Sequence, residues 1–409
     1  MIVVVAEKPS VGRDIARVLK CTGKGEGFLR GESYIITWAV GHLVALCEPD
    51  EVDEKYKKWR MEDLPMLPAH IPTKVLPKTR SQFTIIKKLI NADDTERLIC
   101  ATDAGREGEL IFRLIYQQAK CKKPVDRLWI SSMTDEAIRE GFASLKSAAE
   151  YDGLYRSAAC RSQADWLVGM NASRAFTLRF DALLSIGRVQ TPTLAILVKR
   201  YHEIADFKPE EYFTLTADFW DYSGQWFDPK NEDEKKNNRI PDKETADQLA
   251  KLVRGKEAQV QSVTAEPRKE LAPQLYDLTS LQRDANRKLG FTADKTLKLA
   301  QELYEKWKAV TYPRTDSRYL PMDMIGRAKL TLQKLPGAYQ PLVQGIPWGE
   351  EGKLPFSRRI FDNAKVSDHH ALIPTPQTAP MDKLPPDAAK LFDMIARRTV
   401  AAFYPAYEY

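Results

Sequence analysis

Carboxylates in the first third of the chain have the composition of a metal site. Asp103, Glu107 and Glu109 fall within the stretch Asp-Ala-Gly-Arg-Glu-Gly-Glu after one apolar run, and Glu7 follows another apolar run, Ile2–Ala6. Carboxylate oxygens suit a hard cation such as Mg²⁺, which keeps several waters and contacts substrate phosphates. The alternative is an acidic first helical turn, which the helix dipole stabilises without any metal.

A tyrosine and an arginine two residues apart form a second reactive pattern, in the segment Thr-Tyr-Pro-Arg-Thr-Asp-Ser that ends at Ser317. The Tyr312 phenol can attack phosphorus once its proton is removed, and the Arg314 guanidinium can hold the charge that develops. Pro313 favours extended backbone at the tyrosine, which would present the phenol outward. Packing and turn formation are the alternative roles for this loop.

Three further groups are candidates for phosphate contacts. Arg188, Gln190 and Thr191 precede or begin a predicted helix, whose free N–H groups attract phosphate. His369 and its neighbour His370 are too few for a zinc site, so phosphate binding or a hydrogen-bond network is the better interpretation. Arg161 lies one helical turn from Asp165, and an exposed ion pair is its alternative role.

Strands that alternate with helices are predicted over the first 150 residues. Each of three apolar runs precedes a helical pattern, the first helix capped by Ser10 and the third by Thr134; the runs are Ile2–Ala6, Arg97–Asp103 and Leu128–Ser131. Such alternation predicts a mostly parallel sheet, whose ligands bind beyond the carboxyl ends of its strands. We therefore expect Glu7 and the Asp103 cluster to lie at one edge.

Helices dominate the prediction from about Tyr151 onward, with one small antiparallel element. Two alternating segments predict strands, and the polar stretch 228–238 between them predicts a solvated loop. Two adjacent helices after Pro273 have the spacing of a helix-turn-helix or winged-helix unit. The predicted helices are Ala158–Arg174, one capped by Thr191, Thr279–Leu289, Thr292–Lys306 and about Pro386 to Phe403; the predicted strands are Phe213–Phe219 and Gln259–Thr264.

Composition narrows the class of protein. The 409 residues exceed one ordinary domain, and 62 Lys and Arg against 56 Asp and Glu give a net charge of +6, which permits a polyanionic partner. The five cysteines include no Cys-x-x-Cys spacing, so neither a zinc ribbon nor a disulfide framework is expected. We find no signal peptide, long apolar run or nucleotide-binding P-loop, and expect a cytoplasmic protein without a membrane partner.

Six segments together resemble the type IA DNA topoisomerases, and within that family the bacterial topoisomerase III group. They are AEKPSVGRDIA, CATDAGREGELIFR, ADWLVGMNASRA, SIGRVQTPTLA, VTYPRTDSRYLP and SDHHALIPT, spread over essentially the whole chain. The resemblance implies an α/β Toprim domain at 1–150, part of a helical DNA-binding base at 151–208, part of a β arch or hinge at 209–272, and a winged-helix-like domain at 273–409. It also implies a multidomain, toroidal architecture, here truncated at the C-terminus.

The resemblance also assigns roles to individual residues. Tyr312 would form a 5′-phosphotyrosine, Lys8 would act as an acid, Arg314 would bind the scissile phosphate and Glu7 would assist beside the metal. Mg²⁺ would be held by Glu7, Asp103 and Glu107, and DNA by Arg161, Arg188, Gln190, Thr191, His369 and Ser317. One departure is Gly105, where the family has an aspartate; we expect weaker metal binding there, with Glu109 as a possible substitute ligand.

The implied function is ATP-independent cleavage of one DNA strand, passage of another through the gap, and religation, which relaxes negative supercoils or decatenates DNA. The expected partners are single-stranded or negatively supercoiled DNA and a helicase, in the cytoplasm of a bacterium and associated with its nucleoid. The alternatives are a Toprim primase or nuclease, which needs no Tyr312, and a truncated DNA-binding fragment that lacks turnover.

Overall fold

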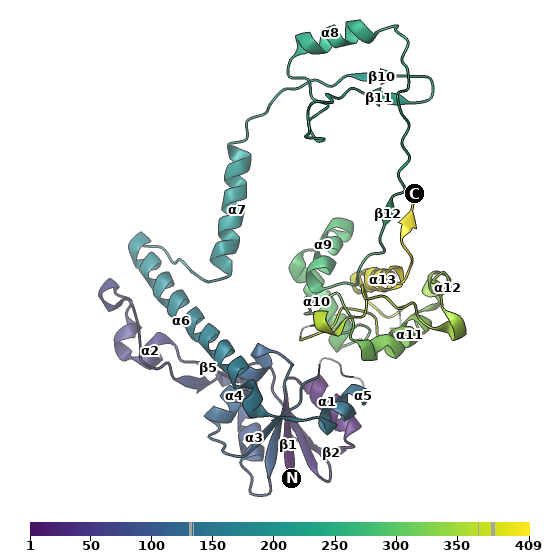
Figure 1. The fold of residues 1–409 in the computed structure, drawn as a ribbon. Helices are drawn as coiled ribbons and strands as arrows, with labels where there is room; N and C mark the ends of the chain where they lie inside the picture. The colour runs from purple at the N-terminus through teal and green to yellow at the C-terminus, as the bar shows by residue number, and fades with distance from the viewer. Residues whose placement is uncertain (131–132, 134, 367, 378–380) are drawn as a thin grey trace. The chain divides into compact units, whose positions relative to one another are not determined.

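The computed structural model describes residues 1–130, 133, 135–366, 368–377 and 381–409. The chain divides into two compact units. The first contains residues 1–187 and 268–409, and the second contains residues 188–267. Figure 1 follows the chain from the purple N-terminus to the yellow C-terminus.

A mixed sheet of seven strands, in the order β2-β3-β4-β1-β7-β8-β9, organises the start of the first unit. Its centre is parallel, as predicted, because β1 pairs with β4 and β7, and β7 pairs with β8, in the same direction. The edge strands pair antiparallel. The strands are β1 (Ile2–Ala6), β2 (Gly23–Gly25), β3 (Phe28–Arg30), β4 (Tyr34–Trp38), β7 (Arg97–Ala101), β8 (Val125–Arg127) and β9 (Lys146–Ser147).

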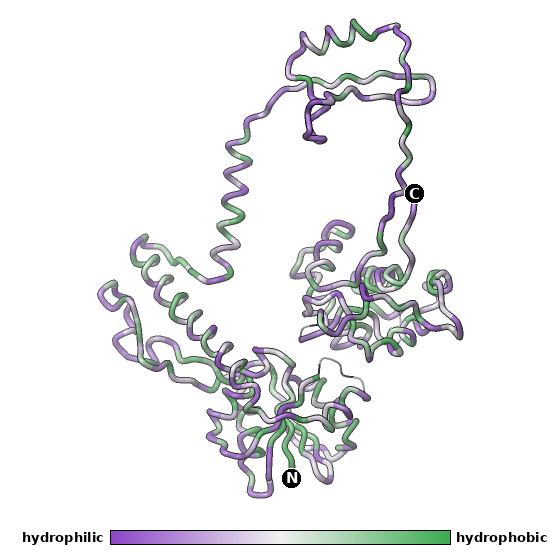
Figure 2. Tube along the Cα trace, viewed as in Figure 1, coloured by the Kyte–Doolittle hydropathy of each residue, from purple (hydrophilic) through white to green (hydrophobic). Residues whose placement is uncertain are grey.

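Helices cover both faces of this sheet because successive strand residues point to opposite sides. Val3 and Val5 pack with α3 (Arg80–Ile90) and α4 (Arg106–Gln118) on one face. Val4 and Ala6 pack with α1 (Pro9–Val18) on the other face, where α5 (Asp135–Ala143) also lies (Figure 1). Strands buried on both faces are continuously apolar, as their hydrophobic colour in Figure 2 shows.

Two predictions about these elements are wrong. The third parallel strand is Val125–Arg127 rather than Leu128–Ser131, and Ser131 and the predicted cap Thr134 lie outside the described residues. Helix α1 is not capped by Ser10, because Lys8 is its N-cap and Pro9 is its first residue. Proline suits that position, where its fixed φ is helical and its missing N–H costs no hydrogen bond. Ser10 therefore lies inside the helix.

A helical body, residues 268–409, completes the first unit around its own hydrophobic core. The predicted helix pair is confirmed as α9 (Leu278–Leu289) and α10 (Ala293–Glu305). Gly290 ends α9 at φ 68°, a left-handed conformation that favours glycine. The other elements of this unit are β5 (Val44–Leu46), α2 (Pro49–Val52), β6 (Thr73–Val75), α6 (Asp152–Phe180), β12 (Lys269–Glu270), α11 (Ile325–Gln333), α12 (Gln340–Gln344), α13 (Pro386–Ala401) and β13 (Tyr407–Glu408).

The second unit contains α7 (Gln190–Ala205), β10 (Thr216–Asp218), β11 (Ser223–Gln225) and α8 (Lys243–Val253). Strand β10 pairs with β11 instead of with Gln259–Thr264, which is not a strand. Thr191 is the second residue of α7 rather than its cap. The predicted polar loop forms turns, whereas α8, which Asp242 caps, was not predicted.

None of the described helices combines the length and the apolar composition that a bilayer crossing requires.

Candidate active site

The carboxyl ends of β1 and β7 bring two carboxylates together, as the parallel pairing predicts. Ala6 lies opposite Ala101 in the sheet register, so Glu7 and Asp103 follow at the same edge. The Glu7 carboxylate accepts a hydrogen bond from the Asp103 backbone N–H at 2.9 Å. Burial, and then the nearby negative charge of Asp103, raise the pKa of Glu7 to about 7. Two adjacent carboxylates in a partly buried place are a suitable oxygen pair for a divalent cation.

The turn that carries Asp103 is fixed from beneath by a buried arginine. Arg127 is fully buried, and its guanidinium donates to the carbonyl oxygens of Thr102 at 2.8 Å and Asp103 at 2.7 Å. Its charge is balanced by Glu109, also fully buried, at 3.0 Å. Glu109 pairs with Arg113 as well, at 2.8 Å. Glu109 is therefore a structural residue here, and its predicted use as a substitute metal ligand is wrong.

Lys8 and His369 converge on one oxygen of Asp103. Lys8 Nζ lies 3.2 Å and His369 Nε2 lies 3.1 Å from Asp103 Oδ2. Burial alone would raise the pKa of Asp103, but the hydrogen bond from His369 and the charge of Lys8 outweigh burial, and the pKa is well below its usual range. Lys8 is likewise buried, yet the charges of Asp103 and Tyr312 raise its pKa above the usual value. Both groups are charged at neutral pH.

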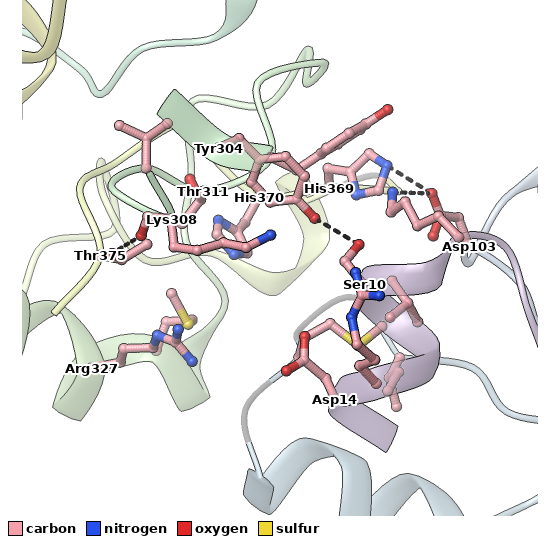
Figure 3. Close-up of a pocket in the computed structure, with 18 of the residues that line it drawn as sticks. Ser10, Asp14, Asp103, Tyr304, Lys308, Thr311, Arg327, His369, His370 and Thr375 are labelled. Atoms are coloured by element: carbon pink, nitrogen blue, oxygen red, sulfur yellow. Dashed lines mark hydrogen bonds and ion pairs between the residues drawn. The ribbon is translucent and has the colours of Figure 1, made fainter. Parts of the chain in front are cut away.

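Tyr312 lies against this charged pair. Lys8 Nζ is 3.7 Å from the centroid of the Tyr312 ring, and the His369 ring centroid is 4.5 Å away. Tyr304 from α10 packs edge-on against Tyr312 at 5.3 Å, and its hydroxyl lies 3.3 Å from the Ser10 hydroxyl (Figure 3). Burial raises the pKa of Tyr312 although the charge of Lys8 opposes that shift. The phenol therefore keeps its proton at neutral pH.

The loop around Tyr312 contains two further predicted site residues, Arg314 and Ser317, and it places them differently. With its amide oxygen toward the guanidinium, Gln301 of α10 accepts from Arg314 Nε and Nη2 at 3.1 Å each. Arg314 is exposed and close enough for its charge to act on the Tyr312 phenol. Ser317 is buried, and its hydroxyl donates to the Lys365 carbonyl at 2.9 Å. The structure thus places Arg314 at the site and Ser317 inside the loop.

Glu107 lies in the first turn of α4 and contacts a histidine. His42 Nε2 is 2.5 Å from Glu107 Oε1. That hydrogen bond lowers the pKa of Glu107 most, and the charges of Arg161 and Arg106 lower it further. Within the described part of the chain, no three His, Cys, Asp or Glu side chains form a ready metal cage. The donor set therefore fits a cation held by Glu7 and Asp103 that takes its other ligands from water or substrate.

The two glycines of the metal turn are required by close contacts. A Cβ on Gly108 would lie 2.2 Å from the Asp103 carbonyl oxygen, so the turn could not close. A Cβ on Gly105 would lie 2.3 Å from Asp368 Oδ1. The Asp368 carboxylate thus occupies the space that a side chain at position 105 would need.

The first unit therefore brings together Glu7, Lys8, Asp103, Tyr312, Arg314 and His369, with Glu107 and Arg161 beside one another. Arg188, Gln190 and Thr191 belong to the second unit. Sequence reasoning missed His42, Arg127, Tyr304 and Asp368 as contributors. Only Asp368 stood inside a segment already singled out, and the other three carried no local signal.

Comparisons with known proteins agree with this arrangement. Residues 2–133 match the Toprim domain and residues 149–409 match the DNA topoisomerase family. The chain is 46% identical over 407 residues to DNA topoisomerase 3 of Bacillus subtilis (strain 168), and 46% identical over 409 residues to that of Bacillus cereus (strain ATCC 14579). Each alignment covers 100% of this chain and 55% of the relative, so the chain spans about half the length of these relatives.

The fold is also similar to a solved one. Full-length topoisomerase I from Thermotoga maritima superposes with a TM-score of 0.62 at 22% sequence identity, over 99% of this chain and 61% of that one. A Toprim sheet with a carboxylate edge, next to a helical body that carries a half-buried tyrosine, is the arrangement of a type IA topoisomerase. The chain belongs to that family, and the resemblance seen in the sequence is confirmed.

Proposed function

We propose that this chain carries the strand-cleaving centre of an ATP-independent type IA DNA topoisomerase, with Tyr312 as its nucleophile. The contact of Lys8 with both Asp103 and the Tyr312 ring carries the proposal. This contact joins the Toprim edge to a tyrosine about 300 residues later. A Toprim primase or nuclease would need no tyrosine at that edge.

In the proposed reaction, Tyr312 Oη attacks a phosphodiester phosphorus and releases its proton to solvent. The new O–P bond forms as the bond from phosphorus to the 3′-oxygen breaks, which leaves a 5′-phosphotyrosine and a 3′-hydroxyl. Lys8 is charged and close to Tyr312, so it can donate the proton that the 3′-oxygen needs. Arg314, held by Gln301, stabilises the negative charge on the phosphate oxygens. Religation reverses these steps.

Glu7 and Asp103 would hold a divalent cation, for which we propose Mg²⁺. Glu107 would become a third ligand when its contact with His42 is broken. When bound, Mg²⁺ supplies charge that positions the phosphate oxygens. The carboxylates themselves orient the site, because Asp103 fixes Lys8 and His369 on one oxygen.

The substrate that we propose is single-stranded or negatively supercoiled DNA. Arg161 and His369 would contact the strand near the reacting phosphate, and Arg188, Gln190 and Thr191 would contact it at the start of α7. Ser317 is better assigned to the shape of the loop. We also propose strand passage by the longer protein, a helicase partner, nucleoid association in the bacterial cytoplasm, and the four-part domain division given above.

Tyr312→Phe tests the chemistry directly. The variant should bind a single-stranded oligonucleotide but form no covalent adduct, because the ring stays and the attacking oxygen is lost. The measurement is denaturing electrophoresis after incubation with Mg²⁺ and a strand labelled at either end, and Tyr319→Phe is the control. An adduct with Tyr312→Phe contradicts the proposal, and cleavage without any adduct in the parent indicates a nuclease.

A further inference from the structure

An open groove of about 800 Å³ lies in the Toprim domain, away from the candidate active site. It runs between β6, one face of α3 and Gln118, the last residue of α4 (Figure 1). We call it the α3 groove. Glu107 is in the first turn of α4, so about 17 Å of helix separates the metal turn from Gln118. The residues that line the α3 groove are all different from those assigned above to cleavage.

The α3 groove is lined by cations without an opposing carboxylate among the described residues. The cations are Lys74, Arg80, Lys87 and Lys88. Lys74 pairs with Glu51, which lies outside the lining. Within the described ranges, the side chains of Arg80, Lys87 and Lys88 form no ion pair. Positive charge that is not compensated in a concave place attracts a polyanion.

The three unpaired cations form a row along one face of α3. Arg80, Lys87 and Lys88 are exposed, and their spacing places them on the same side of the helix over about 12 Å. Lys87 and Lys88 lie in the last turn, where the helix dipole stabilises a cation. Arg80 is the first residue of α3, where the same dipole disfavours a cation. The stability of the helix therefore explains the two lysines but not the row.

The uncharged part of the lining offers a hydrogen-bond donor and no exposed ring. Gln118 Oε1 accepts from the Thr73 hydroxyl at 2.9 Å, which leaves the amide N–H groups of Gln118 as donors. Phe83 is the one aromatic residue among the described lining residues, and it is buried in the core. Proteins that bind single strands stack the bases on exposed rings. A cationic groove without such a ring suits a backbone whose bases are already paired.

We propose that the α3 groove binds the phosphate backbone of duplex DNA, at a distance from the strand that reacts at Tyr312. A duplex carries one phosphate charge per about 1.7 Å, so about 12 Å of α3 lies along about seven of them. Such contacts position DNA without reading its sequence. The choice of DNA over an acidic protein rests on the proposed function, but the groove shares no residue with the cleavage centre.

The test removes two charges from the groove and, as a control, two charges from elsewhere in the same domain. The groove variant is Lys87→Gln with Lys88→Gln, because glutamine keeps a high helix propensity. The control is Lys24→Gln with Lys146→Gln, two exposed lysines on the edge strands β2 and β9, outside the groove. Both are made in the Tyr312→Phe chain and titrated with a short blunt duplex over a range of salt concentrations.

The groove variant should bind the duplex more weakly, and its slope of log affinity against log salt should fall by about two, one for each lost phosphate contact. The control should keep the slope of its Tyr312→Phe parent. Equal changes in both variants, or no change in either, overturn the proposal. Loss of binding to a polyglutamate peptide with duplex binding retained also overturns it and indicates an acidic protein as the ligand.

A separate measurement keeps this proposal distinct from the proposed function. With Tyr312 restored, the groove variant should form the covalent adduct with a single-stranded oligonucleotide as fast as the parent does. Slower adduct formation would place Lys87 and Lys88 on the reacting strand and overturn the proposal. If the parent itself forms no adduct, the proposed function fails, whereas the duplex titration still decides whether the α3 groove binds DNA.

Discussion

Asp103 Oδ2 is contacted by two side chains of the site, Lys8 and His369. The same two residues flank the Tyr312 ring. One carboxylate oxygen therefore holds two of the residues that contact the Tyr312 ring. Because Asp103 depends in turn on Arg127 through its backbone carbonyl, the order of the site extends into the core of the sheet.

Breaking the buried ion pair between Glu109 and Arg127 should lower the free energy of unfolding. Glu109→Ala leaves the guanidinium of Arg127 buried without its counterion, and we expect a loss of about 3–5 kcal/mol in the free energy of unfolding. Lys298→Ala, which breaks the exposed pair with Asp294, should cost less than about 1 kcal/mol. Urea unfolding of both variants measures the difference. Similar small losses would mean that water reaches Arg127.

The raised pKa of Glu7 predicts that the stability of the folded chain depends on pH. Between pH 4.5 and about 7 the unfolded chain releases this proton while the folded chain retains it, so stability falls as pH rises through that window. Glu7→Gln keeps a hydrogen-bond acceptor without the charge. It should be more stable than the parent at pH 8, and the difference should vanish below pH 4.5. Thermal unfolding across this range checks it, and a difference independent of pH would contradict the assignment.

The junction between α9 and α10 was predicted well, because Gly290 and Thr292 give local signals there and the structure uses both. Asp277, which caps α9, was not predicted. The strand predictions were wrong where the pairing partner decides whether a segment forms a strand. Gln259–Thr264 alternates only weakly in polarity. The strand within Phe213–Phe219, β10, pairs instead with β11, which follows it after a short turn.

The site residues show the same difference between what a local pattern predicts and what depends on packing with distant segments. The resemblance located Tyr312, Lys8 and the metal turn, because these residues lie in continuous motifs. The contacts of Tyr304 and His42 depend on packing between segments far apart in the chain, which no local pattern reports. Gly105 was read as a missing ligand, whereas the structure adds that Asp368 fills its space.

The cap of α9 links that helix to the nucleophile loop, which predicts a functional effect. Asp277 accepts from the Ser280 N–H at 2.6 Å and from Arg318 Nε at 2.8 Å, and the Leu278 N–H donates to the Thr315 carbonyl. Asp277→Ala should cost about 1–2 kcal/mol and slow adduct formation.

Thr292→Ala is the matched control, since it removes the cap of α10. It should cost about 1 kcal/mol and leave adduct formation unchanged. Unfolding in urea and single-turnover cleavage give the two readouts. Equal slowing by both variants would show that general destabilisation, and not the loop, is responsible.

At the scale of the whole molecule, the two units differ in how much apolar surface they expose. The first contains extensive buried cores, whereas α7 in the second is exposed along its length. Leu194, Leu197, Tyr201 and Ile204 recur at helical spacing and are each at least 60% exposed. An apolar stripe of this kind favours association.

We therefore expect the 409-residue chain to self-associate and to bind a hydrophobic dye. Leu197→Lys with Tyr201→Ser should reduce both, because the substitutions interrupt the stripe. Leu252→Lys, on exposed surface of α8, is the control and should change little. Sedimentation and dye fluorescence over a range of concentrations measure the effect. A monomeric parent chain with weak dye binding would contradict this prediction.

In the proposed reaction, the reacting groups are divided between the Toprim edge and the helical body. Lys8 and Asp103 belong to one side, and Tyr312 and Arg314 to the other. If the two bodies part while a strand is attached to Tyr312, the phosphotyrosine loses its proton donor and its carboxylates at the same moment. In the proposed reaction, a strand held by Tyr312 would therefore be resealed only when the residues of both bodies are together again.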